Sequence, residues 1–285
     1  TVASTGEERY IEFLVVDNRY APILGLETCV RLRIIKRIDA MRKSEGEAFV
    51  NNNADVFEGL GRFPGEMKIL LRDDVKPKVH YQKRFPLSIR DRLKEELESM
   101  EERGIIERVD HATEWVNNVQ VVEKKDGRLR VCLDPRPLNQ GIMREHFPIP
   151  TIEDLTANLA GKKVFSVMDL EAGFWHIVLE EKSAELTTFM TPFGRYKFKR
   201  LAFGLNCAPE YFQKRMVQIF GGIPGVVIYF DDILITAESD EEHDLIMKKV
   251  LERARRNGVK FNPRKVQYKV MEAAFMGNKI SAAGI

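Results

Sequence analysis

Residues 226–235 read VVIYFDDILI, an apolar run interrupted by two adjacent aspartates, Asp231 and Asp232. The β-branched and aromatic residues predict a strand on either side, with a hairpin turn at the Asp-Asp pair. An ionised carboxylate near a dry core costs several kcal/mol unless a positive charge compensates it, and the run contains no Lys or Arg. A metal ion could supply that charge. The alternative is an exposed turn with two hydrated aspartates.

The composition is that of an ordinary globular protein, and 285 residues are enough for about two domains. The formal net charge is only +2, so any contact with nucleic acid must come from local basic patches. There is no apolar run of about 18 residues and no signal-peptide pattern, so we expect neither a membrane span nor secretion. The cysteines have neither zinc-site nor disulfide spacing, which predicts reduced thiols at Cys29, Cys132 and Cys207.

Periodic segments predict helices and strands in mixed order. In 87–104 apolar residues recur every three to four positions, Ser88 and Asp91 resemble a capping box, and Gly104 is a stop signal. Asp126-Gly127 predicts a hairpin. The predicted elements are a helix over 87–104, a hairpin over 119–134, a strand over 162–169, and helices over 209–220 and 241–257. Because they interleave without strict β–α–β alternation, the predicted fold class is α+β.

The N-terminal part differs from the rest. The chain begins TVASTGEERY without Met, so we expect it to be a piece of a longer polypeptide. Residues 10–38 form a compact pattern that starts with a strand over 11–16. Residues 39–56 are polar and include three consecutive asparagines, which predicts a linker and a domain boundary.

A third carboxylate, Asp169, closes the apolar strand 164–168 much as Asp231 closes the strand before it. If the two strands are neighbours in one sheet, three carboxylates lie within reach of one point. Mg²⁺ prefers such oxygen ligands, and two ions about 4 Å apart can clamp the attacking and leaving oxygens of a phosphoryl displacement. The alternative for Asp169 alone is a cap on the following turn.

Several motifs together resemble one family. FSVMDLEAGFWHI, LAFGLNCAPEYFQKRM, YFDDILI and FMGNKIS occur in the order and approximate spacing of reverse transcriptases of gypsy-like LTR retrotransposons, which are related to retroviral polymerases. The resemblance extends from about residue 57 to 285 and implies fingers and palm subdomains, with an antiparallel sheet covered by helices on one face. It implies that Asp231 and Asp232 are the aspartate pair of the palm and Asp169 their partner. Together they would hold two Mg²⁺ ions, for which Mn²⁺ could substitute.

The resemblance also implies a nucleotide pocket. Phe174 is similar to the aromatic gate that excludes a 2′-hydroxyl and so selects dNTPs. Leu170 would offer a backbone group to the metal and the triphosphate, and Glu171 one to the triphosphate. Phe203 would line the pocket, and Gly204 would allow a close backbone approach.

The segment KKDGRLR resembles the fingers tip that closes on the triphosphate. Five basic residues stand against two acidic ones between positions 124 and 136: Lys124, Lys125, Arg128, Arg130 and Arg136 against Asp126 and Asp134. Arg130 best matches the triphosphate-binding arginine of the family, because a guanidinium fork suits phosphate. Either Lys124 or Lys125 would assist it, and a solvated basic hairpin is the alternative.

Two further roles are implied near the C-terminus. Lys265 in FNPRKVQY resembles a lysine that could protonate the leaving pyrophosphate as a general acid. Phe275, Met276 and Gly277 resemble the hairpin that grips the primer end.

The segments IEFLVVD and ILGLETC resemble the C-terminal portion of a retroviral-type aspartic protease. Residues 1–38 would then be a partial retropepsin-like segment. The Asp-Thr/Ser-Gly triplet is absent, so we expect no proteolysis. A short βα unit would explain residues 10–38 equally well.

The function implied is that of an RNA-directed DNA polymerase, which adds dNTPs to a primer 3′-hydroxyl on an RNA or DNA template. The chain would end before the thumb, with RNase H and integrase in the parent Pol polyprotein. The location implied is intracellular, in the cytoplasm or in virus-like particles. The rival expectation is an inactive or domesticated retroelement remnant that at most binds nucleic acid.

Overall fold

The computed structural model describes residues 38–81, 85–123, 127–151, 159 and 161–284. The chain divides into two compact units, Thr1–Asn52 and Asn53–Ile285. The described part of the first unit is helix α2 (Ile38–Asn52), so most of the segment predicted as a linker is helical. Met, Ala, Arg, Lys and Glu in this segment are strong helix formers, and polarity alone does not separate an exposed helix from a linker. The strand predicted over 11–16 lies outside the described residues.

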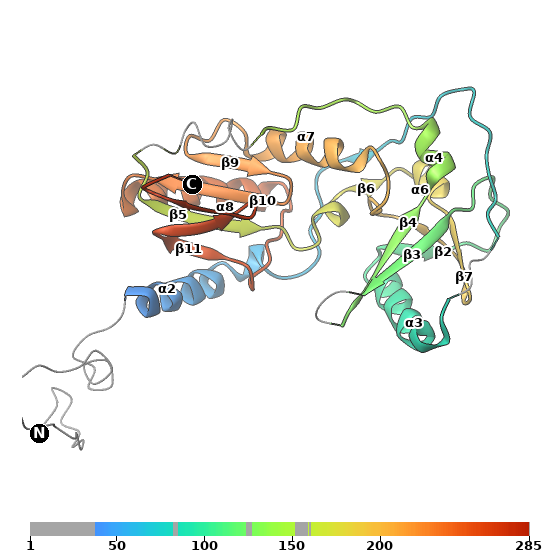
Figure 1. The fold of residues 1–285 in the computed structure, drawn as a ribbon, viewed down its shortest axis with the longest axis horizontal. Coiled ribbons are helices and arrows are strands. Elements are labelled where there is room, and N and C mark those ends of the chain that lie inside the picture. The colour runs from blue at the N-terminus through green and yellow to red at the C-terminus, as the bar shows by residue number, and fades with distance from the viewer. Residues whose placement is uncertain (1–37, 82–84, 124–126, 152–158, 160, 285) are drawn as a thin grey trace, which may run out of the picture. The chain divides into compact units, whose positions relative to one another are not determined.

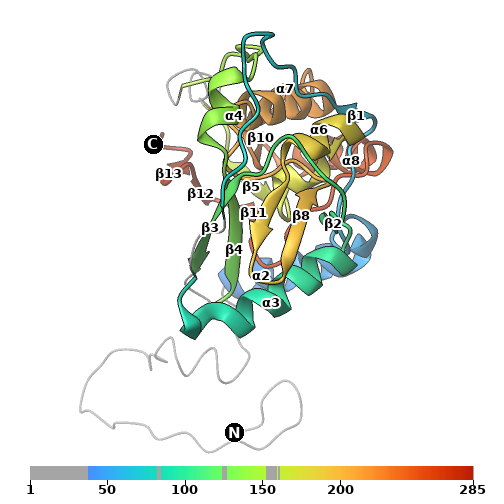
Figure 2. The same cartoon turned by 90° about the vertical axis from the view of Figure 1, so that its right-hand side faces the viewer.

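The second unit mixes helices and strands without regular alternation, and its central sheet is antiparallel, which confirms the α+β class (Figures 1 and 2). Its first half contains η1 (Ala54–Val56), β1 (Glu66–Met67), α3 (Leu87–Glu102), β2 (Ile106–Arg108), β3 (Asn118–Glu123), β4 (Leu129–Asp134), α4 (Arg136–Gly141), β5 (Val164–Asp169) and η2 (Gly173–His176). Its second half contains β6 (Val178–Leu179), α6 (Glu181–Leu186), β7 (Phe189–Thr191), β8 (Gly194–Phe198), α7 (Ala208–Phe220), β9 (Val226–Tyr229), β10 (Asp232–Ala237), α8 (Asp240–Arg256), β11 (Gln267–Val270), β12 (Glu272–Phe275) and β13 (Asn278–Ser281).

A four-stranded antiparallel sheet in the order β11-β5-β10-β9 forms the centre of this unit. β5 is buried along its whole length because both faces of the sheet are covered. On one face, α8 contacts β5 and β10, while α7 contacts β9 (Figure 1). On the other face, Phe165 and Val167 pack in a core cluster with Ala273, Phe275 and Ile280 of the hairpin β12–β13.

The remaining strands form smaller sheets at the other end of the unit, as Figure 1 shows. β2, β8 and β7 pair in a three-stranded sheet, and β3 and β4 form the predicted hairpin. α3 buries Leu93, Leu97 and Met100, the predicted apolar face. The predicted capping box is wrong, because α3 begins at Leu87 with Pro86 as its N-cap, and Ser88 lies inside the first turn.

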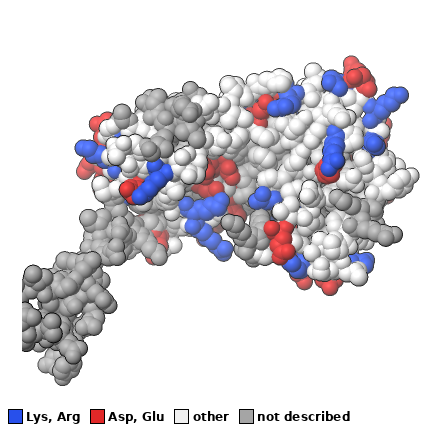
Figure 3. All heavy atoms as spheres, in the orientation of Figure 1, with Lys and Arg blue, Asp and Glu red and all other residues white. Residues whose placement is uncertain are grey.

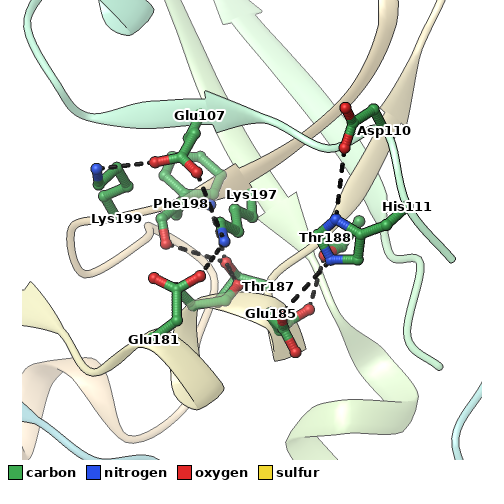
Figure 4. A network of polar contacts seen from close by, with 11 residues as sticks. Glu107, Asp110, His111, Glu181, Glu185, Thr187, Thr188, Lys197, Phe198 and Lys199 are labelled. Carbon is green, nitrogen blue, oxygen red and sulfur yellow. Dashed lines mark hydrogen bonds and ion pairs between the residues drawn. The ribbon is translucent and has the colours of Figure 1, made fainter. Parts of the chain in front are cut away.

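A buried cation of the three-stranded sheet is paired with carboxylates (Figure 4). Lys197 on β8 is 3% exposed, lies opposite Glu107 of β2 and forms ion pairs with Glu107 and Glu181. Burial alone would lower the pKa of Lys197, but the paired carboxylates outweigh it and the pKa is raised. Glu107 also accepts a charge-assisted contact from Lys199 at 2.8 Å. The ammonium of Lys197 has lost most of its hydration, and the two carboxylates offset the cost of that loss.

Among the described helices, none combines the length and apolar character needed to cross a bilayer. Cys132 and Cys207 form no disulfide, and Cys29 lies outside the described residues.

Candidate active site

The hairpin within residues 226–235 joins β9 to β10. β9 ends at Tyr229 and β10 begins at Asp232, so the turn consists of Phe230 and Asp231 and lies one residue earlier than predicted. Phe230 has a φ of 49°, in the left-handed region that bulky side chains rarely occupy. Such a conformation costs on the order of 1–2 kcal/mol and persists only where neighbouring groups hold it.

Gln213 of α7 holds this turn. Its side chain is fully buried; its Oε1 accepts a hydrogen bond from the Phe230 N–H at 2.7 Å, and its Nε2 donates to the Ile228 carbonyl at 3.2 Å. The Gln213 amide therefore bonds the backbone carbonyl before Tyr229 and the backbone N–H after it. Sequence reasoning missed this residue. The available signal was a lone amide next to the apolar face of α7 formed by Phe212 and Met216.

The structure brings Asp169, Asp231 and Asp232 together. Asp169 ends β5 and lies directly opposite Asp232 of β10, which places their Cβ atoms about 5 Å apart on the same face of the sheet. The Leu170 N–H donates to the Asp231 carbonyl at 2.8 Å, so the turn is fastened to the residue after Asp169. This is the arrangement required if the three carboxylates are to share cations.

Crowding perturbs these carboxylates. Reduced hydration and then the charges of Asp231 and Asp169 raise the pKa of Asp232 to about 6. The pKa of Asp231 is also raised, first by reduced hydration among the surrounding protein atoms and then by the negative charge of Asp169. Asp231 nevertheless remains exposed to solvent. The site therefore favours protonation or a nearby cation.

Lys265 provides one cation. Its ammonium donates to Asp169 Oδ2 at 2.7 Å. Partial burial would lower the pKa of Lys265, but the bond to Asp169 and the charges of Asp231 and Asp232 raise it. In Figure 3 acidic and basic side chains gather beside each other near the middle of this face of the molecule.

The donor set fits Mg²⁺ or Mn²⁺, since three crowded carboxylates offer hard oxygen ligands and more negative charge than Lys265 alone compensates. Among the described residues, no three His, Cys, Asp or Glu side chains already surround one point as metal ligands would. Leu170 is buried beside Asp169 and forms a bridge with Phe261, and its N–H is already donated to the Asp231 carbonyl. Its contribution to a metal or a triphosphate stays a prediction.

Three residues predicted for the nucleotide pocket come together from different segments. The ring of Phe174 on η2 lies 5.1 Å from that of Phe203, centroid to centroid. The Arg130 guanidinium of β4 lies over Phe203 at 5.0 Å from its centroid. The positive charge of Arg130 also acts on Asp231, which links the β3–β4 hairpin electrostatically to the aspartates.

Two other pocket predictions are modified by the structure. Gly204 allows a close backbone approach, but the approach is to β4: its φ is 108°, and a Cβ there would overlap the Leu133 carbonyl oxygen. The Glu171 N–H donates to the Lys260 carbonyl at 3.0 Å, so this N–H is already engaged. Lys124 and Lys125 lie outside the described residues.

His176 connects the turn bearing Phe174 to the same region. Its Nδ1 bonds the Gly173 carbonyl at 3.1 Å, and its Nε2 accepts from the Lys260 N–H at 3.0 Å. Burial lowers the pKa of His176 to about 4, so the ring is neutral near pH 7 and can accept at Nε2. Sequence reasoning missed this role, because both partners are backbone groups that only the tertiary fold identifies.

The hairpin β12–β13 carries the residues predicted to grip the primer. Met276 and Gly277 form its two-residue turn with φ values of 52° and 78°, the left-handed pair of a type I′ turn. Met276 and Tyr229 both pack against the core cluster beneath the sheet. The hairpin therefore lies on the same sheet face as Asp169 and Asp232.

A Ser166–His243–Asp244 arrangement, whose Asp244 is exposed, lies on the opposite face of the sheet. Ser166 Oγ is 2.8 Å from His243 Nε2, and His243 Nδ1 is 3.5 Å from Asp244 Oδ1. Ser166 and His243 are fully buried, so no substrate could reach the hydroxyl. Ser166 also accepts from the Lys269 N–H at 2.9 Å, and the arrangement fastens β11 and α8 to β5.

Comparison with known proteins identifies the family of the chain. Residues 122–280 match the family model described as reverse transcriptase (RNA-dependent DNA polymerase). An uncharacterized protein, K02A2.6 of Caenorhabditis elegans, is 31% identical over 284 residues, which cover 94% of this chain and 22% of that protein. The retrovirus-related Pol polyprotein from transposon 412 of Drosophila melanogaster is 35% identical over 158 residues, covering 55% of this chain and 13% of the polyprotein. The chain thus spans less than a quarter of the length of these relatives.

Solved structures show the same fold. A foamy viral protease-reverse transcriptase in complex with double-stranded DNA matches with a TM-score of 0.78 at 20% identity, over 94% of this chain and 49% of that one. The foamy viral enzyme in complex with an RNA/DNA hybrid matches with a TM-score of 0.76 at 21% identity, over 86% and 33%. Together with the family match over more than half of the chain, these findings show that the chain belongs to the reverse transcriptase (RNA-dependent DNA polymerase) family, in the form found in Pol-polyprotein-like proteins of transposons.

Proposed function

We propose that this chain carries the active site of an RNA-directed DNA polymerase, which adds deoxynucleotides to a primer 3′-hydroxyl. The observation that carries the proposal is the cross-strand pair of Asp169 and Asp232, with Asp231 beside it in a turn held by Gln213. Asp169, Asp231 and Asp232 would hold two Mg²⁺ ions, or Mn²⁺ in their place, with the Leu170 backbone beside them. Such ions lower the pKa of the primer hydroxyl and stabilise charge on the leaving pyrophosphate.

The residues around the aspartates position the nucleotide. Arg130 would bind the triphosphate through its guanidinium fork, assisted by Lys124 or Lys125. The Phe174 ring would pack under the sugar and exclude a 2′-hydroxyl, supported from behind by Phe203. Glu171 would contribute through its carbonyl or side chain, because its N–H is engaged.

Two residue groups act on the other reactants. Lys265 is placed at the aspartates, where its ammonium could donate a proton to the leaving pyrophosphate as a general acid. Phe275, Met276 and Gly277 would hold the primer end, since their hairpin lies on the face that carries Asp169 and Asp232.

The partners proposed are a primed RNA or DNA template and dNTPs. The related foamy viral enzymes are described in complex with an RNA/DNA hybrid and with double-stranded DNA, which supports this choice. Binding through template phosphates would weaken as salt rises.

We further propose that the parent protein is a gypsy-like LTR-retrotransposon Pol polyprotein with RNase H and integrase domains, acting in the cytoplasm or in virus-like particles. Residues 1–38 would be a retropepsin-like remnant, 39–56 the connection and 57–285 the fingers and palm. The match to the worm protein covers 94% of the chain, so it extends into the segment before residue 57.

Primer extension on an RNA template with Mg²⁺ and dNTPs tests the proposal. We expect extension by the wild-type chain and none by Asp231→Asn, with template binding retained by both. Template binding by both proteins with extension by neither would refute polymerase activity and favour the nucleic-acid-binding module. Extension by Asp231→Asn at the wild-type rate would refute the assigned role of that aspartate.

A further inference from the structure

We propose that Lys265 is the resident counter-ion of the three-aspartate site, and that a divalent cation must displace its ammonium to bind. Lys265 would thereby set the metal affinity of the site, in addition to any role in proton transfer. This inference rests on the proposed function, since it takes Asp169, Asp231 and Asp232 to be the metal ligands.

The ion pair joins a fixed partner to a movable one. The Asp169 side chain is 10% exposed at the end of a buried strand, whereas the Lys265 side chain is 59% exposed. Their atoms are 2.7 Å apart. The ammonium can therefore swing into solvent, while the carboxylate remains where it is.

The pairing of β11 with β5 determines the position of Lys265. Gln267 of β11 pairs with Val167 of β5, and extending this antiparallel register by two residues places Lys265 beside Asp169. Asp169 then lies between Lys265 on one side and Asp232 on the other.

A turn strengthens this placement. The Lys265 N–H donates to the Asn262 carbonyl at 3.2 Å, and the Asn262 side chain accepts from the Arg264 N–H at 3.0 Å. The Asn262 N–H in turn donates to the backbone carbonyl of Asp169 at 2.8 Å. The lysine is thus carried on a turn that is hydrogen-bonded to its own partner.

Metal and ammonium compete for the same oxygen. A divalent ion binds carboxylate oxygens at about 2.1 Å, so an ion on Asp169 Oδ2 would lie within a few ångströms of an ammonium bonded to that atom. Two like-signed ions at this separation repel strongly even in water. Allowing the ammonium to retreat into solvent, we expect its presence to weaken divalent binding by about five- to tenfold.

Mn²⁺ binding to the full chain, measured from the free-ion EPR signal at pH 8 without nucleic acid, tests this inference. Lys265→Met removes the charge and keeps the aliphatic stem, and Lys265→Arg keeps the charge. Arg264→Met removes an equal charge from the same turn at a residue whose side chain does not bond Asp169. We expect about five- to tenfold tighter binding by Lys265→Met, with Lys265→Arg close to wild type and Arg264→Met changed less than twofold.

A second measurement separates displacement from general charge effects. In EDTA, thermal unfolding of Lys265→Met should begin at a lower temperature than that of the wild type, since three carboxylates lose their counter-ion. Saturating Mn²⁺ should remove this difference. Unchanged or weaker Mn²⁺ binding by Lys265→Met, or an equal gain in Arg264→Met, would overturn the inference. Mn²⁺ binding that Asp231→Asn leaves intact would instead refute the metal site itself.

Discussion

Replacing Asp232 with Asn should stabilise the metal-free protein while removing its activity. Asp232 opens β10 opposite Asp169, with Asp231 next to it in the chain, so its carboxylate is ionised in a crowded and poorly hydrated position. Asn has nearly the same size and leaves the backbone pairing of β10 unchanged. The substitution therefore removes the charge and little else.

The magnitude follows from the pKa of Asp232, which rises from an ordinary 3.8 to about 6. A rise of about two in the pKa of Asp232 lowers the free energy of unfolding by about 3 kcal/mol at pH 8, since a change of one in pKa corresponds to about 1.4 kcal/mol. Partial exposure and coupling to Asp169, Asp231 and Lys265 reduce this to about 1–2 kcal/mol.

The sign of the pH dependence can be worked out directly. Because the folded pKa exceeds the unfolded one, the folded state binds the proton more tightly. The stabilisation that comes from this tighter proton binding by Asp232 is fully present below about pH 3.8 and is lost as pH rises through about 6. At pH 8 Asp232 is ionised and the wild type has lost all of this stabilisation, whereas Asp232→Asn has no carboxylate to ionise at this position and loses none. At pH 5 the difference between the two proteins should be about half as large.

Urea unfolding in EDTA at pH 8 and pH 5 measures this difference. We expect Asp232→Asn to raise the free energy of unfolding by about 1–2 kcal/mol at pH 8. The exposed Asp73 is a matched control, for which Asp73→Asn should change stability by less than about 0.5 kcal/mol. Saturating Mg²⁺ should stabilise the wild type selectively. An Asp232→Asn variant no more stable than wild type at pH 8 would refute the electrostatic reasoning.

Three further substitutions probe the surroundings of the aspartates. Phe174→Val should admit ribonucleotides, which single-nucleotide incorporation of rNTPs against dNTPs measures; unchanged sugar selectivity would remove its gate role. Gly204→Ala should lower the free energy of unfolding by about 3 kcal/mol or more, because its Cβ would overlap a main-chain oxygen of β4. Gly59 has open space around it, so Gly59→Ala is the control and should lower the free energy of unfolding by only about 1 kcal/mol. Urea unfolding measures both changes. Gln213→Met should lower kcat by about tenfold or more while template binding stays unchanged, because the Phe230 turn loses both of its side-chain hydrogen bonds; an unchanged kcat would contradict this.

The features predicted from the sequence are those whose determinants are local. The strand ending at Asp169, the two helices α7 and α8, and the β3–β4 hairpin each have a periodic pattern or a turn signal within a short window. The fold class followed from their order. The gathering of the aspartates was predicted only on the condition that their strands pair, and that pairing is a tertiary fact.

The features that were missed depend on contacts between distant segments. Gln213 and His176 bond backbone groups, which have no signature in the sequence. The close approach that requires Gly204 is to β4, about 70 residues earlier in the chain. Residues 39–56 were assigned as a linker because composition reports polarity, whereas the helix there depends on the propensity of each residue.

The three carboxylates remain together because each is held by structure that does not depend on its charge. Asp169 ends a strand buried on both faces, Asp232 is fixed by the register with that strand, and Asp231 lies in a turn held by Gln213. Their mutual repulsion is therefore opposed by packing and backbone hydrogen bonds elsewhere in the sheet. It follows that neutralising one carboxylate should relieve repulsion without moving the others. The Asp→Asn variants should then keep the fold and template binding, so a loss of extension in them reports on chemistry.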